Sequence, residues 1–142
     1  MMKNSTGLVW HAALALGFVL MPGCSRAPAA RIIYHDEQGL WRMTPEGKDI
    51  HPLASSGVDG EYSPDNTQIA FSKFYNAGIW VADADGENPD QPTSFGSSPS
   101  WSPDGEQIAY VNLYDWCICA VNSDGSGEHR IRAEGELPDW SN

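Results

Sequence analysis

The chain has 142 residues, a formal net charge of −11 and a hydrophobic content of 41%. This length favours a single domain, and the acidic excess disfavours nucleic acid as a partner because it repels phosphate backbones. The 14 glycines, the 10 prolines and the many aromatic residues favour short strands and tight turns over long helices.

The first 23 residues have the parts of a bacterial export signal. Lys3 supplies a positive charge, and residues 8–21 form a mostly apolar stretch that is too short for a comfortable membrane span. Gly23-Cys24 then resembles the lipobox of bacterial lipoproteins, in which a Cys after a small residue is acylated and becomes the new N-terminus. The alternative is a non-lipidated secretory signal with an incidental Cys.

The lipobox resemblance implies a lipid anchor on Cys24 that holds the chain to a membrane. Ser25 follows the Cys. In Gram-negative lipoproteins, a residue other than Asp at this position usually implies sorting to the outer membrane, so the resemblance implies that the anchor lies there. We therefore expect a signal peptide at 1–23, a tether at 24–30 and a folded domain at 31–142, on the periplasmic side of the cell envelope.

The rest of the chain repeats with a period of 39 residues. Ser63-Pro64-Asp65 recurs as Ser102-Pro103-Asp104, followed by Asn66 in the first copy and Gly105 in the second. Each copy predicts a tight turn, because proline presets φ, Asp can bond its own backbone, and Asn or Gly tolerates a positive φ. Other markers keep the same step: Trp41 and Trp80; Ile69 and Ile108; Gly47, Gly86 and Gly125; Tyr62, Trp101 and Trp140.

A period of about 40 residues with four short strands per unit is typical of a β-propeller blade. We name the expected strands a to d within each blade. Strand a ends at 61–62, 100–101 and 139–140; strand b covers 31–35, 68–73 and 107–112; strand c covers 40–43, 78–82 and 117–121; strand d covers 49–53, 90–93 and 129–132. The sequence thus predicts an all-β fold of three four-stranded blades. The order of strands starts with a strand b and ends with a strand a, so it is offset by one strand from the blade boundaries.

Three stretches carry a resemblance to a known family. They are Ser102-Pro103-Asp104-Gly105, Ile108-Ala109-Tyr110 and residues 79–89, and they resemble the WD40-like repeat of TolB-type β-propellers. The resemblance covers residues 31–142 and implies propeller blades, which occur in periplasmic scaffolds and as accessory domains of peptidases. TolB-type propellers are commonly six-bladed.

Three blades of this size are few for a closed ring, since propellers usually have about four to eight. Four alternatives follow: a part of a longer protein, an open arc capped by a partner, a tight three-blade ring, or a homodimer that forms one six-bladed ring. The homodimer is suggested by the offset, which leaves complementary edges at the two ends.

The sequence lacks the usual patterns of a catalytic or metal site, and we predict no catalytic residue, no metal and no cofactor. Residues 96–100 do not match the Gly-x-Ser-x-Gly nucleophile motif. The stretch with Asp83, Asp85 and Asn88 lacks the later ligands of a calcium loop. The histidines His35, His51 and His129 show no metal-binding spacing.

Cys117 and Cys119 flank one residue of a predicted strand. Their Cα atoms would lie about 6.6 Å apart, at the upper edge of disulfide geometry, so a bond between them needs distortion. An interchain bond is an alternative in an oxidising compartment. We favour packing, because Cys119 stands at the repeat position of Trp80.

Aromatic residues off the repeat pattern are the best candidates for an exposed contact. Tyr114 and Trp116 lie in the third b–c loop, and Tyr75 lies in the equivalent second loop. We expect these three to form one binding rim, whereas the serines of the Ser-Pro-Asp turns are structural.

The sequence therefore predicts a lipid-anchored, non-catalytic propeller module that binds a protein partner in the cell envelope. The alternatives are an accessory or substrate-gating propeller of an envelope enzyme system, a glycan-binding envelope lipoprotein, and a purely structural or degenerate lipoprotein.

Overall fold

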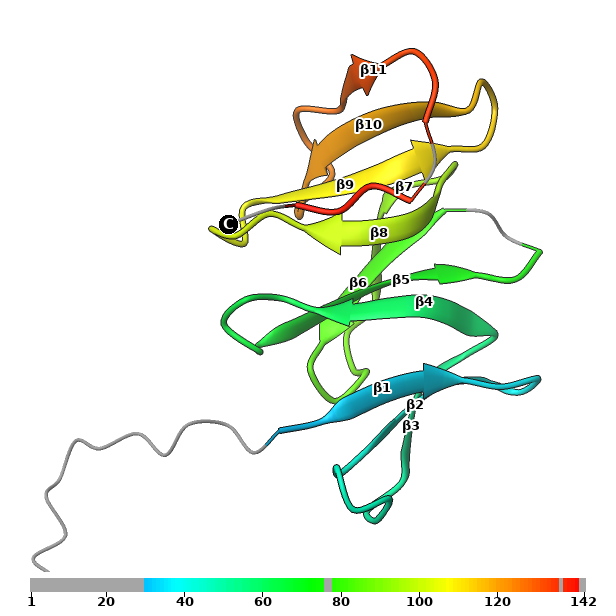
Figure 1. Cartoon of the computed structure of the whole chain (residues 1–142), viewed down its shortest axis with the longest axis vertical. Coiled ribbons are helices and arrows are strands. Elements are labelled where there is room, and N and C mark those ends of the chain that lie inside the picture. Colours follow the sequence, from blue (N-terminus) through cyan, green and yellow to red (C-terminus); the bar gives the residue numbers. More distant parts are fainter. Residues whose placement is uncertain (1–29, 76–77, 136, 141–142) are drawn as a thin grey trace, which may run out of the picture.

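The computed structural model describes residues 30–75, 78–135 and 137–140. All regular elements in this part of the chain are strands, which form three antiparallel sheets stacked face to face (Figure 1). No helix among these residues is long and apolar enough to cross a membrane. The predicted signal peptide, the lipidation site Cys24 and residues 24–29 of the predicted tether lie outside the described residues.

Each sheet corresponds to one blade. The first blade contains β1 (Ile32–His35), β2 (Gly39–Met43) and β3 (His51–Ser55). The second contains β4 (Gly57–Tyr62), β5 (Gln68–Lys73), β6 (Ile79–Asp83) and β7 (Asp90–Thr93). The third contains β8 (Ser97–Trp101), β9 (Gln107–Asn112), β10 (Cys117–Asn122) and β11 (His129–Arg132).

The structure confirms the predicted all-β propeller fold. Strands b, c and d occur in all three blades, and strand a occurs in the second and third as β4 and β8. The predicted strand at Asp139–Trp140 is wrong, because these residues are irregular in the structure. No strand b of a further blade lies beside them in the described part of the chain, and a strand exists only where a neighbour completes its hydrogen bonds.

Alternating side chains build one apolar core between each pair of blades. Leu40 and Leu53 of the first blade pack against Ile69 and Phe71 of the second. On the other face of the second blade, residues such as Ile79 meet the third blade. That core contains Ala70, Ile79 and Val81 on one side and Trp101, Ile108, Tyr110, Cys117, Cys119 and Val121 on the other.

The described blades form an open arc. The first and third blades lie at opposite ends of the stack, with the second between them (Figure 1). The alternative of a tight three-blade ring is therefore wrong for this structure. The first and third blades each keep one face that no neighbouring blade covers among the described residues.

Candidate functional site

The blades present two different ends, because consecutive strands run antiparallel. The c–d turns of all three blades and the a–b turns of the second and third blades emerge at one end, which we call the turn end. The b–c and d–a loops emerge at the opposite end, which we call the loop end; it lies on the right in Figure 1.

At the turn end, the two Ser-Pro-Asp turns have nearly identical hydrogen bonds. The hydroxyl of Ser63 donates to Asp65 Oδ1 at 2.6 Å, and the backbone N–H of Gln68 donates to Ser63 Oγ at 3.0 Å. In the second copy, Ser102 donates to Asp104 Oδ1 at 2.6 Å and accepts the N–H of Gln107 at 2.9 Å. Asn66 and Gly105 have φ of 60° and 73°, as this turn requires.

These bonds favour ionised carboxylates in the turns. The Ser102 hydroxyl, followed by the backbone N–H of Glu106, holds the pKa of Asp104 below its usual range. The Ser63 hydroxyl and the Thr67 N–H lower the pKa of Asp65 in the same way. Pro64 and Pro103, which precede the two carboxylates, line a hollow between the turns. The polar groups of the turns are thus largely used to hold their own backbone.

At the loop end, the three rim residues predicted from sequence are all exposed. Tyr75 is fully exposed in the β5–β6 loop, and Tyr114 and Trp116 of the β9–β10 loop are 88% and 58% exposed. Tyr75 and Trp116 also have positive φ values of 64° and 55°. Such values are uncommon for aromatic residues and are found where the surrounding structure fixes the backbone.

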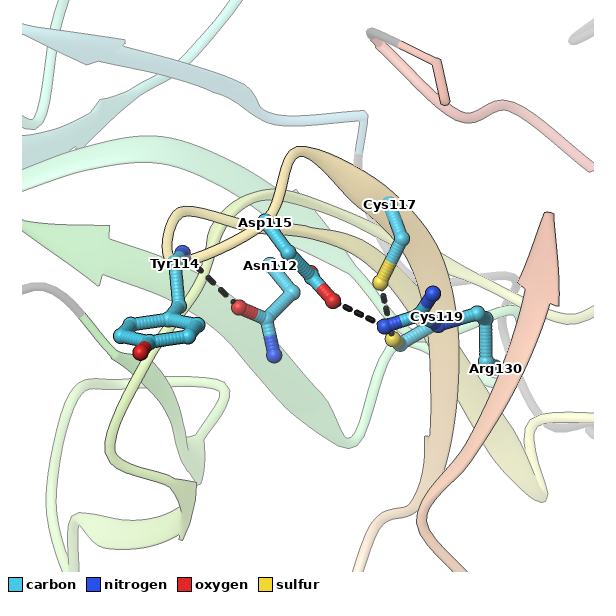
Figure 2. Close-up of polar contacts among 6 residues, drawn as sticks. All are labelled: Asn112, Tyr114, Asp115, Cys117, Cys119 and Arg130. Carbon is cyan, nitrogen blue, oxygen red and sulfur yellow. Dashed lines mark hydrogen bonds and ion pairs between the residues drawn. The ribbon is translucent and has the colours of Figure 1, made fainter. Parts of the chain in front are cut away.

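Polar contacts fix the β9–β10 loop, as Figure 2 shows. The backbone N–H of Tyr114 donates to Asn112 Oδ1 at 2.9 Å, and the N–H of Trp116 donates to the Asn112 carbonyl at 2.9 Å. Between these residues, Asp115 accepts a hydrogen bond from Arg130 of β11 and forms an ion pair with it. The loop therefore presents two large aromatic side chains from a fixed backbone.

The two cysteines lie on β10, which begins directly after this loop (Figure 2). Cys117 and Cys119 are buried free thiols on one face of β10, and their Sγ atoms are 3.1 Å apart. Burial and the neighbouring Asp115 raise the pKa of Cys117 to about 12, so the protonated thiol dominates at neutral pH. Both side chains belong to the core between the second and third blades, which agrees with the packing role predicted for them.

Two further aromatic residues are exposed at the loop end: Phe74, which the sequence places in the same b–c loop as Tyr75, and Phe95, which sequence reasoning missed. Phe74 is 41% exposed and its ring contacts those of His35 and Tyr75, at centroid distances of 6.4 and 6.3 Å. Phe95 is 58% exposed in the d–a connection between β7 and β8. The antiparallel order of the strands could have placed Phe95 at the loop end, since d–a and b–c connections lie at the same end of a blade.

Within residues 30–75, 78–135 and 137–140, no three His, Cys, Asp or Glu side chains gather in an arrangement that could hold a metal ion. The described side chains at the loop end are mainly aromatic and suit contact with another surface.

We found no family model and no curated protein sequence that matches the chain. Similar solved structures exist. A putative TolB from Agrobacterium tumefaciens has 23% identity and a TM-score of 0.67, over 78% of this chain and 46% of that one. A chain of the nidogen/laminin complex has 13% identity and a TM-score of 0.58, over 71% of this chain and 43% of that one.

An enzyme is also similar in fold. The acylaminoacyl peptidase of Pyrococcus horikoshii has 16% identity and a TM-score of 0.51, over 67% of this chain and 20% of that one. The chain thus spans less than half the length of each of these proteins. At such identities the likeness concerns the fold, and the fold of the described residues is that of a partial TolB-like β-propeller.

Proposed function

We propose that the chain is a lipid-anchored module of the cell envelope that binds another protein through the loop end of its blades and catalyses no reaction itself. The observation that carries the proposal is the pair of exposed aromatic side chains, Tyr114 and Trp116, on a loop that hydrogen bonds hold in place. Aromatic residues are enriched at protein interfaces, and a preformed loop loses little conformational entropy on binding.

The fold supports this proposal by analogy. The TolB-like blades and the likeness to a chain of the nidogen/laminin complex both fit a role in holding proteins together. The strongly acidic composition disfavours nucleic acid. A second copy of the chain is a further partner under the same proposal, since each end of the arc leaves a blade face open.

Photo-crosslinking in cells tests the binding surface. A photoreactive amino acid at Tyr114 should form adducts with an envelope protein, and the added change Trp116→Ser should reduce them at least about tenfold, as expected for an interface hot spot. The same photoreactive residue at Glu46, an exposed position of the turn end, serves as the control. Equal adducts from both positions would contradict the proposal.

Metabolic labelling tests the anchor. The full chain expressed in a Gram-negative host should incorporate labelled palmitate and fractionate with the outer membrane. Cys24→Ala should abolish the label, because it removes the sulfur that would carry the lipid. A wild-type chain without label, or one released as a soluble periplasmic protein, would contradict the anchor and leave the binding surface untouched.

Glycan binding is the second candidate, and the exposure of Trp116 and Tyr114 favours it because aromatic faces also stack on sugar rings. If it is correct, Trp116→Ala should abolish binding to a glycan array and leave the fold intact. A wild type that binds no glycan would remove this candidate. An accessory role in an envelope enzyme system would instead place a catalytic subunit among the crosslinked partners.

A further inference from the structure

The first blade leaves exposed or half-buried two side chains whose equivalents are buried in both other blades. Tyr34 lies opposite Trp41 in the β1–β2 pair, just as Phe71 lies opposite Trp80 in the β5–β6 pair. Tyr34 is therefore equivalent to Phe71, and Ile32, two residues earlier on the same face, is equivalent to Ile69. By the same comparison, Tyr110 and Ile108 of β9 are the equivalent residues in the third blade.

Burial at these positions depends on the preceding blade. Ile69 and Ile108 are 0% exposed because the first and second blades cover them, whereas Ile32 is 39% exposed. Ile32 and Met43 form a second directly opposed pair beside Tyr34 and Trp41. These four side chains make an apolar face on the first blade, which we call the leading face.

The inner edge of the first blade is also incomplete. In the second and third blades, strand b pairs with strand a on one side and strand c on the other. In the first blade β1 pairs only with β2 among the described residues, so its other edge lacks a strand. An open edge beside an apolar face is what an added strand and blade would cover.

The other end of the arc carries the complementary surface. Ala70 and Ile79 of the second blade accept the third blade, and their equivalents one period later are Ala109 and Ile118 on the outer face of the third blade. Pro138 and Trp140 cross this face and enclose a cleft of about 480 Å³ with Ala109 and Ile118.

Residues 137–140 stand where the last part of strand a of a following blade would lie. They border Ser98–Ser100 of β8 and Asp59–Glu61 of β4, the two inner strands. Trp140 is the repeat equivalent of Trp101, whose indole N–H donates to the Glu61 carbonyl at 3.3 Å. The indole nitrogen of Trp140 is buried and has no hydrogen-bond partner in the part of the chain that the structure describes.

We propose that residues 138–140 of one copy pair with the free edge of β1 in a second copy, supply strand a of its first blade, and so join two copies head to tail into one ring. The inference rests on the proposed function only in taking a second copy as a partner. A head-to-tail contact made twice about a two-fold axis closes the assembly. One copy matches 46% of the Agrobacterium chain, so two copies would match most of a chain of that length.

The repeat sets the register. Tyr62 lies opposite Ile69 in β4–β5, and Trp101 lies opposite Ile108 in β8–β9. Trp140 of one copy should therefore lie opposite Ile32 of the second copy, and Asp139 opposite Ile33. This register places Asp139 diagonally across from Arg31 of the second copy, where opposite charges attract.

A disulfide between the two copies tests this register in the full chain, expressed with its own leader in a Gram-negative host. Directly opposed residues of an antiparallel pair have Cβ atoms close enough to bridge. Ile33→Cys combined with Asp139→Cys should give a covalent dimer on a non-reducing gel after oxidation. Each single variant, the native-cysteine chain and a Glu46→Cys/Asp139→Cys control should give at least about tenfold less dimer.

Absence of the dimer band would overturn the proposal, and so would a bond within one chain, which migrates faster than the reduced monomer. The mass of the detergent-extracted chain gives an independent readout. Wild type should contain two copies, and Tyr34→Glu, which places a charge on the leading face, should contain one. Tyr114→Ser/Trp116→Ser should remain at two copies, so a failure of the rim proposal is distinguishable from a failure of the ring.

Discussion

The two ends of the blades use polar and aromatic residues in opposite ways. At the turn end, Ser102 is 3% exposed and its hydroxyl is hydrogen-bonded both to Asp104 and to the backbone of Gln107. At the loop end, Tyr114 and Trp116 are largely exposed and only their backbone is held. Side chains at the turn end thus hold the fold, while those at the loop end remain available to another molecule.

This difference gives a rule for separating stability from binding. Substitutions at the turn end should lower the free energy of unfolding, because they remove internal bonds or create clashes between blades. Substitutions of the exposed aromatic side chains should change binding and leave the free energy of unfolding nearly unchanged.

The largest expected effect is at Gly86, in the c–d turn of the second blade. Its φ is 91°, and an added Cβ would lie 2.2 Å from the carbonyl oxygen of Leu53 in the first blade. Backbone atoms cannot move aside cheaply, so Gly86→Ala should cost more than about 3 kcal/mol and separate the two blades. Chemical denaturation monitored by tryptophan fluorescence measures the loss.

Gly47 provides the matched control for this prediction. It occupies the same turn one period earlier with φ of 72°, and an added Cβ would meet nothing within 4 Å. Gly47→Ala should therefore cost only about 1 kcal/mol, which comes from its backbone conformation. Both variants are compared at nanomolar protein concentration, so that contacts between copies of the chain do not contribute. Equal losses for the two variants would show that contact between blades is not the cause.

A smaller loss is expected from Ser102→Ala. The change removes the acceptor of the Gln107 N–H at a buried site, which typically costs about 1–3 kcal/mol. Ser55→Ala, at an exposed position on β3, should stay within about 0.5 kcal/mol of wild type. A Ser102 variant as stable as the Ser55 variant would show that the turn does not depend on this hydroxyl.

Acid should weaken the turn end. The pKa values of Asp65 and Asp104 are lowered in the fold, chiefly by the Ser63 and Ser102 hydroxyls. Groups with lowered values stabilise the fold above their unfolded pKa, near 4, and lose this contribution as the pH falls through the folded value. Unfolding free energy should thus fall between pH 5 and pH 2, less steeply in Asp65→Asn/Asp104→Asn. An unchanged pH slope in that variant would contradict the assignment.

The sequence was sufficient for the parts of the fold that depend on local chemistry. The 39-residue period located strands b, c and d and the Ser-Pro-Asp turns, because turn residues and alternating apolar positions act within a few residues. Only the end of strand a was predicted, since β4 begins at Gly57 in a stretch without regular alternation.

Long-range contacts explain most of what the sequence did not predict. Asp139–Trp140 repeats the end of strand a but forms no strand in the structure, because pairing depends on a neighbour and not on the residues themselves. The exposure of Tyr114 and Trp116 was predicted from their place off the repeat. The bracing of their loop was not, because Arg130 lies fifteen residues beyond Asp115.

The smallest expected effect on stability comes from the exposed aromatic pair. Tyr114→Ser/Trp116→Ser removes side chains that are 88% and 58% exposed, so the free energy of unfolding should change by less than about 1 kcal/mol. Crosslinking to the envelope partner should nevertheless be lost, because aromatic anchors carry much of the energy of an interface.

Asp115→Ala, in the same loop, separates the effect of the fixed loop backbone from that of the aromatic rings themselves. It leaves both aromatic residues in place and removes the acceptor for Arg130, so the β9–β10 loop should loosen. We expect weaker partner binding with a slower association rate, because part of the loop population no longer presents the rings correctly. If Asp115→Ala binds like wild type while Tyr114→Ser/Trp116→Ser does not, the rings alone provide the affinity and the fixed loop contributes nothing to it.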